Sequence, residues 1–304
     1  MLCHFHNTIN NNNYLWGVLM KKLLFQLDTD SHPSVFDTVV GYDGGADHVI
    51  GHGNCNAENV AALVEGAVFT RAPKDKKNTA LFIGGSDMLV AEEILTAVKN
   101  QYFSNFRVSM MLDSNGSNTT AAAAVAKISL KTNLAGKKAV ILGGTGPVGQ
   151  RAAVMMANEG ASVCISSRKQ ARAEQACAHI KSLFDVDVEA AGGGSDEERA
   201  ALCDDAQIVI STGAAGIQLL AEEHWRESKS IEVLLDANAT PPAGIGGTKV
   251  MDEGELRHGK TVWGAIGFGK FKLLLHRACI AKLFESNDLV LDAEQIFALA
   301  KEMA

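Results

Sequence analysis

The segment AVILGGTGPVG, residues 139–149, decides the fold. Its first four residues are apolar, as in a buried strand, and they run directly into the pattern Gly144-x-Gly146-x-x-Gly149. The residues that follow, PVGQRAAVMMANEG, have the composition of a helix. A strand, this glycine spacing and a helix together predict a dinucleotide-binding fold, with the pyrophosphate on the free N–H groups that open the helix.

Each glycine of this turn has an expected role. Gly144 permits the tight turn, Gly146 lets the backbone approach the pyrophosphate, and Gly149 lets the helix pack closely on the strand. A proline suits the first helical position, where a missing N–H costs little. A glycine turn that binds no ligand is the alternative interpretation. The predicted cofactor contacts of the loop are Gly144, Thr145, Gly146, Pro147, Val148 and Gly149.

The end of the next predicted strand indicates which dinucleotide binds. An NAD site usually carries an acid ~20 residues after the glycines, but this chain has Ser166, Ser167, Arg168 and Lys169 there. Hydroxyls and cations bind a 2′-phosphate, which a carboxylate would repel, so NADP is the predicted cofactor. A solvated pair at a helix start is the alternative for the two cations. Loops after two later strands complete the predicted cofactor site with Thr212, Gly213, Ala214, Ala237 and Asn238.

Strands and helices alternate on both sides of this segment. Helical patterns, such as the one at 86–103 with apolar residues three or four positions apart, separate short apolar runs. This rhythm predicts an α/β protein with parallel sheets covered by helices. The runs that predict strands are 21–27, 47–51, 79–85, 107–112, 137–142, 161–166, 186–191, 206–211, 231–237 and 261–265.

The length of 304 residues suggests about two domains. The last stretch, 276–304, reads as two amphipathic helices that return to the first half. We therefore expect a Rossmann-type dinucleotide-binding domain at 119–275, inserted into an α/β substrate domain made of 20–118 and 276–304. Residues 1–19, which contain a run of asparagines and no Lys or Arg, are expected to be a disordered extension or a mis-assigned start.

Composition disfavours several classes of protein. The net charge of −7 argues against a large nucleic-acid surface, and no apolar run reaches the ~18–20 residues of a membrane helix. The six cysteines are widely spaced, which favours a reducing, cytoplasmic location. No metal is predicted: Cys3, His4 and His6 lie in a terminus without supporting contacts, and His48 and His52 flank a glycine.

Polar residues that end the strands of the first half are the candidates for substrate binding, because ligands of open α/β sheets bind beyond the carboxyl ends of the strands. Helix capping is the alternative for Asp87, Asp113 and Ser117. Asp43 lies in the glycine-rich segment GYDGGADH, where backbone can approach a flat ring. The predicted substrate-binding residues are Asp28, Asp30, Asp43, Gly85, Asp87, Asp113, Asn115 and Thr119.

Five segments carry a resemblance to a known family: LLFQLDTD, SVFDTVVGYDGGADH, FRVSMMLDSNGSNTTAAA, ILGGTGPVG and LHRACIAKLFES. They closely resemble the bacterial NADP-dependent methylene-tetrahydromethanopterin dehydrogenases, which also act on methylenetetrahydrofolate. The likeness runs from about Met20 to Ala304. It implies a pterin-binding domain around an inserted NADP domain, and a homo-oligomer, in particular a trimer. A reduced pterin is the implied partner, with neither nucleic acid nor membrane.

The resemblance also implies a reaction. A hydride leaves the methylene carbon that bridges two nitrogens of the reduced pterin and adds to C4 of the nicotinamide, which leaves a methenyl cation. No proton moves in this step, so we expect no general base, and the protein acts by holding two rings at near-attack distance. Lys272 matches a lysine at the family's cleft and is the predicted orienting cation. His276 is expected to open the returning helix and to pack between the domains.

Two other functions remain open from the residues alone. A shikimate-type dehydrogenase shares the two-domain plan, but it would want a Lys–Asp pair in the first half, and Lys21 and Lys22 begin a strand rather than follow one. A non-enzymatic module that senses NADP would bind the nucleotide without turnover. A methenyl cyclohydrolase would need a group that activates water, and the sequence offers no clear candidate.

Overall fold

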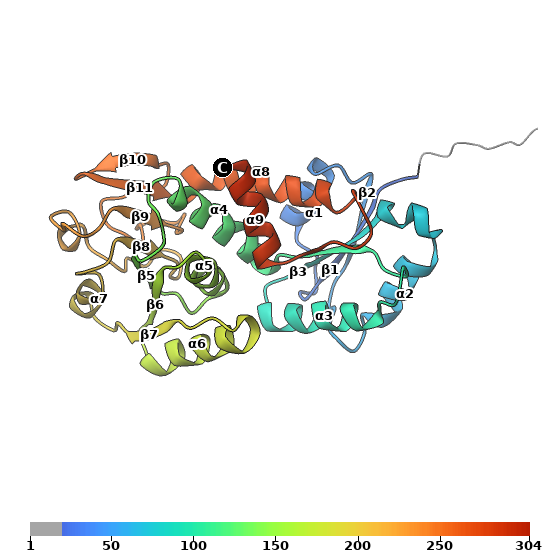
Figure 1. Cartoon of the computed structure of the whole chain (residues 1–304), viewed down its shortest axis with the longest axis horizontal. Coiled ribbons are helices and arrows are strands. Elements are labelled where there is room, and N and C mark those ends of the chain that lie inside the picture. Colours follow the sequence, from blue (N-terminus) through green and yellow to red (C-terminus); the bar gives the residue numbers. More distant parts are fainter. Residues whose placement is uncertain (1–19) are drawn as a thin grey trace, which may run out of the picture.

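The computed structural model describes residues 20–304, so the predictions made for residues 1–19, including Cys3, His4 and His6, lie outside the described residues. Figure 1 shows two sheets that lie side by side, with helices around and between them. All strand pairs but one are parallel. The predicted α/β class with Rossmann-type parallel sheets is confirmed.

The first sheet has the order β12-β4-β3-β1-β2. The chain leaves β1 toward β2 on one side and later places β3 and β4 on the other, so the switch point of this sheet lies between β1 and β3. Its strands are β1 (Leu23–Asp28), β2 (His48–His52), β3 (Thr79–Gly84), β4 (Ser109–Leu112) and β12 (Val290–Leu291). Its helices are α1 (Val35–Asp43), α2 (Ala61–Phe69) and α3 (Met88–Gln101), with 3₁₀ turns η1 (Pro73–Asn78) and η2 (Ser114–Gly116).

The second sheet has the order β10-β11-β9-β8-β5-β6-β7, and only β10 is antiparallel to its neighbour. Its switch point lies between β5 and β8. The strands are β5 (Lys138–Leu142), β6 (Ser162–Ser167), β7 (Glu189–Gly192), β8 (Ile208–Ser211), β9 (Val233–Asp236), β10 (Glu253–Arg257) and β11 (Lys260–Gly264). The helices are α5 (Pro147–Asn158), α6 (Gln170–Phe184) and α7 (Asp196–Leu202), with the 3₁₀ turn η3 (Glu222–His224).

Three helices lie between the sheets: α4 (Ser117–Ser129), α8 (Ala265–Lys282) and α9 (Ala293–Met303) (Figure 1). The segment AAAAVA of α4, residues 121–126, is fully buried, and its small side chains let the other helices pack closely against it. One continuous apolar core contains Met111 of the first sheet and Ile141 of the second. The expected domain boundaries at 118/119 and 275/276 fall inside α4 and α8.

The structure differs from the sequence-based expectation at the C-terminal end. The returning helix α8 begins at Ala265, so His276 lies inside it and does not open it. Gly267, in the part of α8 that was not predicted, is a packing residue, because a Cβ there would lie 1.8 Å from the carbonyl oxygen of Asp252. The short strands β10 and β12 were not predicted, because β10 has a single apolar side chain, Leu256, and β12 is only two residues long.

Candidate active site

A cavity of about 510 Å³ lies at the switch point of the second sheet, where β5 and β8 end. We call it the glycine-loop cavity. Helix α5 begins beside it at Pro147, and its N-cap, Gly146, provides no side-chain hydrogen bond to the first turn. The free N–H groups and the helix dipole therefore favour an anion at this point. The lining residues are Gly143, Thr145, Gly146, Ser166, Ser167, Arg168, Arg172, Gly193, Arg199, Thr212, Gly213, Ala214, Ile217 and Leu219.

The glycines of the loop differ in what a side chain at each position would meet. A Cβ on Gly149 would lie 2.6 Å from the Cα of Gly144, so this contact between helix and turn requires glycine at Gly149. A Cβ on Gly146 would meet no protein atom within 4 Å, so the space in front of α5 is open to a ligand. The backbone N–H of Gly144 donates to the carbonyl of Ser166 at 3.0 Å, which ties the loop to the end of β6.

The polar groups of the glycine-loop cavity fit a dinucleotide with a third phosphate. Ser166 is 1% exposed and its Oγ has no hydrogen-bond partner among the described residues. Arg168 and Arg172 are exposed beside it. Arg199 is instead held by the carbonyl oxygens of Leu219 and Gly193, at 2.6 and 3.0 Å, and shapes the wall.

Eight of the predicted cofactor residues line the glycine-loop cavity and seven do not. Lys169 is the N-cap of α6 and points outside, and Asn238 holds its own loop by bonds to Pro242 and Thr240. The predicted residues that line the glycine-loop cavity are Thr145, Gly146, Ser166, Ser167, Arg168, Thr212, Gly213 and Ala214. Those that do not are Gly144, Pro147, Val148, Gly149, Lys169, Ala237 and Asn238. The pattern did not indicate Arg172 or Arg199, because neither follows a strand directly.

Replacing Arg168 with aspartate is expected to weaken NADP by about 1–3 kcal/mol more than NAD, since a charged hydrogen bond is lost and a repulsion is added. The dissociation constants of both nucleotides, measured by fluorescence titration, check this. Lys169→Asp is the matched control, because its side chain lies outside the cavity, and it should change both constants by much less. Equal weakening of NAD and NADP by Arg168→Asp would remove this residue from the 2′-phosphate.

A second cavity, of about 340 Å³, lies at the switch point of the first sheet, where β1 and β3 end. We call it the first-sheet cavity. Four predicted residues line it: Asp30, Gly85, Asn115 and Lys272. The other lining residues are Ser34, Phe36, Asp37, Ser86, Gly116 and Thr120.

The floor of the first-sheet cavity is built from two loops bonded to each other. Gly85 has a φ of +97°, and a Cβ there would lie 2.0 Å from Oγ1 of Thr29, so only glycine fits. The carbonyl oxygen of Gly85 accepts from Ser114 Oγ and from the N–H of Asn115, both at 2.8 Å. The ends of β3 and β4 are thereby held together under the cavity.

Several predicted acids lie behind or outside the first-sheet cavity. Asp28 is fully buried and accepts from the N–H groups of Asp30 and Ser34, each at 2.9 Å. Asp113 is fully buried as well and accepts from Thr119 Oγ1 at 2.6 Å. These three buried residues, Asp28, Asp113 and Thr119, shape the loops rather than line the cavity.

Two further acids have other partners. Asp43 is the last residue of α1, at the opposite end of the helix from Ser34. Its carboxylate pairs with Arg277 at 2.7 Å. Asp87 caps α3 by accepting from the N–H groups of Leu89 and Val90, at 3.0 and 3.1 Å. This is the role that the capping alternative predicted for it. Neither lines the first-sheet cavity.

Phe36 and Asp37 are lining residues that the sequence did not indicate. Both belong to the first turn of α1, directly after the loop that follows β1; this position in the fold is the signal that could have found them. The ring of Phe36 is 49% exposed at the cavity. Burial raises the pKa of Asp37 to about 7, nearby Asp113 and Asp28 add to the rise, and Ser34 and Lys272 oppose it.

Lys272 and His276 lie one helical turn apart on α8, at the back of the first-sheet cavity. The Nζ of Lys272 lies 4.3 Å from the ring centre of Phe36 and 3.5 Å from Nδ1 of His276. His276 is fully buried and stacks on Phe82, with 5.5 Å between ring centres. Burial lowers the pKa of His276 to about 4 against the pull of Asp113, so the imidazole is neutral near pH 7 and Lys272 is the cation here.

Two more observations complete the site. No group of three or more His, Cys, Asp or Glu side chains within residues 20–304 is arranged to hold a metal ion. Over the same residues, the helices are all too short or too polar to cross a bilayer.

The fold and the two cavities at neighbouring switch points define a two-lobed α/β protein of the Rossmann type, with a candidate dinucleotide site at the glycine loop. Solved structures share this plan at low identity and support the fold alone. Shikimate 5-dehydrogenase from Listeria monocytogenes superposes with a TM-score of 0.54 and 12% identity, over 93% of this chain and 96% of that one. Ornithine carbamoyltransferase from Pyrococcus furiosus has a TM-score of 0.51 and 10% identity, over 86% and 84% of the two chains.

Sequence relatives identify the family. The model of the methylene-tetrahydromethanopterin dehydrogenase N-terminal region matches residues 35–115. The bifunctional protein MdtA of Methylorubrum extorquens is 52% identical over 94% of this chain and all of its own length. The NAD(P)-dependent methylenetetrahydromethanopterin dehydrogenase of the same organism is 33% identical over the same shares. This chain belongs to the methylene-tetrahydromethanopterin dehydrogenase family, so it is an enzyme and the predicted family is confirmed.

Proposed function

We propose that this enzyme transfers a hydride to NADP from the methylene carbon of methylene-tetrahydromethanopterin, methylenetetrahydrofolate or both. The observation that carries the proposal is the first-sheet cavity, in which a flat aromatic ring, a carboxyl and an ammonium meet. The name of the 33% identical relative supports the choice of substrate and an NAD(P) cofactor. NADP, when bound, supplies the acceptor carbon for the hydride.

The residues of the first-sheet cavity suit a reduced pterin. Phe36 offers a face for the ring, Asp37 offers a carboxyl to the donor-rich 2-amino edge, and Lys272 offers a cation to the ring carbonyl. Buried Asp28 and Asp113 hold the loops that position these groups. Because the reaction moves a hydride and no proton, the site needs orientation and electrostatics rather than a base.

Absorbance at 340 nm tests the proposal. The enzyme with NADP should show a rise when either methylene pterin is added, because NADPH absorbs there. Shikimate belongs in the same assay, since the structure does place Lys272 beside Asp37 in one cavity. No rise with either pterin would overturn the proposal, and tight NADP binding without any turnover would favour the sensing module.

Replacing Asp37 with asparagine should raise the KM for the pterin about tenfold and leave the KM for NADP unchanged, because a charge-assisted hydrogen bond is worth roughly 1.5–3 kcal/mol. In the wild type, the carboxyl is ionised above pH 7 and protonated below it. The KM for the pterin should therefore rise as the pH falls through 7, and the variant should lack this dependence. Other groups near Asp37 are Asp28, Asp113 and Lys272. A KM of the variant with the same pH profile as the wild type would contradict the assignment.

The proposal also covers the roles of the two domains, the number of subunits and the location in the cell. We propose that 119–275 binds NADP and that 20–118 with 276–304 binds the pterin. We also propose a homo-oligomer, in particular a trimer, in the cytoplasm. The exposed apolar side chains of Val35, Val39 and Tyr42 on α1, which are 77%, 52% and 49% exposed, support self-association. Sedimentation velocity would measure the number of subunits.

A further inference from the structure

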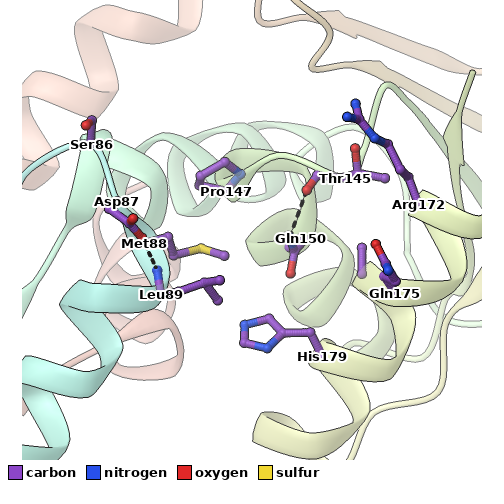
Figure 2. Close-up of a pocket in the computed structure, with 11 residues that line it drawn as sticks. Ser86, Asp87, Met88, Leu89, Thr145, Pro147, Gln150, Arg172, Gln175 and His179 are labelled. Carbon is purple, nitrogen blue, oxygen red and sulfur yellow. Dashed lines mark hydrogen bonds between the residues drawn. The ribbon is translucent and has the colours of Figure 1, made fainter.

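A third cavity, of about 610 Å³, lies between the two sheets and has no role in the account above. We call it the inter-sheet cavity. Figure 2 shows the start of α3 on one side, with Met88 and Leu89, and α5 and α6 on the other, with Gln150, Gln175 and His179. Its volume falls in the range of about 300–1,000 Å³ that is usual for small-molecule sites.

The inter-sheet cavity adjoins both cavities already described. Ser86 lines it and the first-sheet cavity, while Thr145 and Arg172 line it and the glycine-loop cavity. Apart from Thr145 and Arg172, the inter-sheet cavity shares none of the residues that line the glycine-loop cavity. Its wall on the side of the second sheet is built instead from Pro147 and Gln150 of α5 and from the face of α6 that carries Gln175 and His179.

One wall of the inter-sheet cavity is apolar and remains accessible. Leu89 is 54% exposed although it lies in the first turn of α3, and Met88 beside it is 7% exposed. Pro147 and Ala176 face them from the second sheet. An apolar slot of this kind takes an aromatic ring.

The other wall is polar and carries one cation, Arg172. Arg172 makes no ion pair within residues 20–304, and the amide of Gln175 has no hydrogen-bond partner there. Gln150 donates through Nε2 to the carbonyl of Thr145 at 2.8 Å (Figure 2). His179 lies 3.1 Å from Glu92, and Asp87, the acid of this cavity, is engaged in capping α3. Free donors at the far end of an apolar slot favour an anionic group.

We propose that the inter-sheet cavity binds the arylamine tail of the reduced pterin, with the aromatic ring against Leu89 and the terminal carboxylates near Arg172 and Gln175. This rests on the proposed function. The reacting methylene carbon joins a ring nitrogen to the arylamine nitrogen, so the aryl group begins one bond from that carbon. With the pterin ring in the first-sheet cavity, Ser86 marks the side on which the tail leaves.

The proposed site for the tail can be tested by a binding measurement that does not depend on turnover. 4-Aminobenzoyl-glutamate, which carries the aryl ring and the carboxylates but cannot react, should bind the wild-type enzyme in a calorimetric titration. Leu89→Trp fills the apolar slot from an exposed position, so it should weaken this fragment at least tenfold. The dissociation constant for NADP should change less than twofold. Leu256→Trp, on the exposed face of β10 at a residue 77% exposed, is the matched control and should leave both constants unchanged.

Gln175→Glu gives an independent variant, because it places a carboxylate where the tail carboxylates are proposed to lie. It should raise the KM for methylenetetrahydrofolate, and raise it further for the triglutamate form, with kcat unchanged. Equal binding of the fragment to the wild type and to Leu89→Trp would overturn the tail site even if the enzyme turns over. Binding of the fragment with no turnover of either pterin would instead overturn the proposed function and keep the site.

Discussion

Replacing Gly146 with valine is expected to abolish binding of both NADP and NAD while the protein stays folded. A Cβ at this position meets no protein atom within 4 Å, so the valine methyls enter open space and strain nothing. That space lies directly before the first N–H groups of α5, where a pyrophosphate is held. A side chain there separates the phosphates from their donors, and the loss should be at least a hundredfold in affinity, or about 2.7 kcal/mol.

Fluorescence titration with both nucleotides measures the loss, and the far-UV circular dichroism with the urea midpoint reports the fold. Gly66→Val is the matched control, because Gly66 lies in α2, away from every cavity described, and its Cβ would also meet no atom within 4 Å. It should leave both affinities unchanged. Affinity retained by Gly146→Val would show that the loop does not hold the pyrophosphate, and a lowered urea midpoint would show that the open space is needed for folding.

The parts of the fold and site that the sequence predicted well are those written in consecutive residues. A strand, a glycine turn and a helix form one continuous signal, so the start of α5 and the loop before it could be predicted to the residue. The ends of parallel strands meet at one edge of a sheet. For that reason Asp30, Gly85 and Asn115 could be placed at one cavity although they are far apart in the chain.

The parts that escaped prediction depend on packing between distant segments. Asp37 faces the first-sheet cavity because α1 turns its first residues toward the end of β3, and no local pattern states this. Arg172 reaches two cavities only because α6 lies beside α5. Lys169 is adjacent to Arg168 in sequence but occupies the N-cap position of α6 and does not line the cavity. The first turns of α8 were not predicted as helix, because Gly267 is required there by a close contact with Asp252 that the sequence does not reveal.

Replacing Arg151 with methionine is expected to destabilise the protein by about 3–5 kcal/mol. Arg151, on α5, is 2% exposed and donates through Nη2 to Glu92 on α3, at 2.5 Å, so the pair joins the two sheets. Its guanidinium also lies 4.9 Å from the ring centre of Phe184. Methionine keeps much of the volume but leaves the Glu92 carboxylate buried beside His179 without its cation. Removing one partner of a buried pair is costly, because the remaining carboxylate, which is 13% exposed, keeps little solvent and has only the imidazole of His179 beside it.

Urea unfolding compares this variant with Arg277→Met, which removes the same cation from the half-exposed pair with Asp43 at 2.7 Å. Exposed pairs contribute about 0–1 kcal/mol, because water screens both charges. Both variants remove one positive charge, but only Arg151→Met removes it from a buried pair. A similar decrease in the free energy of unfolding in both would mean that the Arg151 pair is solvated in solution. The double variant Arg151→Met with Glu92→Gln removes the stranded charge and should recover part of the loss. If it recovers nothing, the cost of Arg151→Met comes from packing against Phe184 and not from the ion pair.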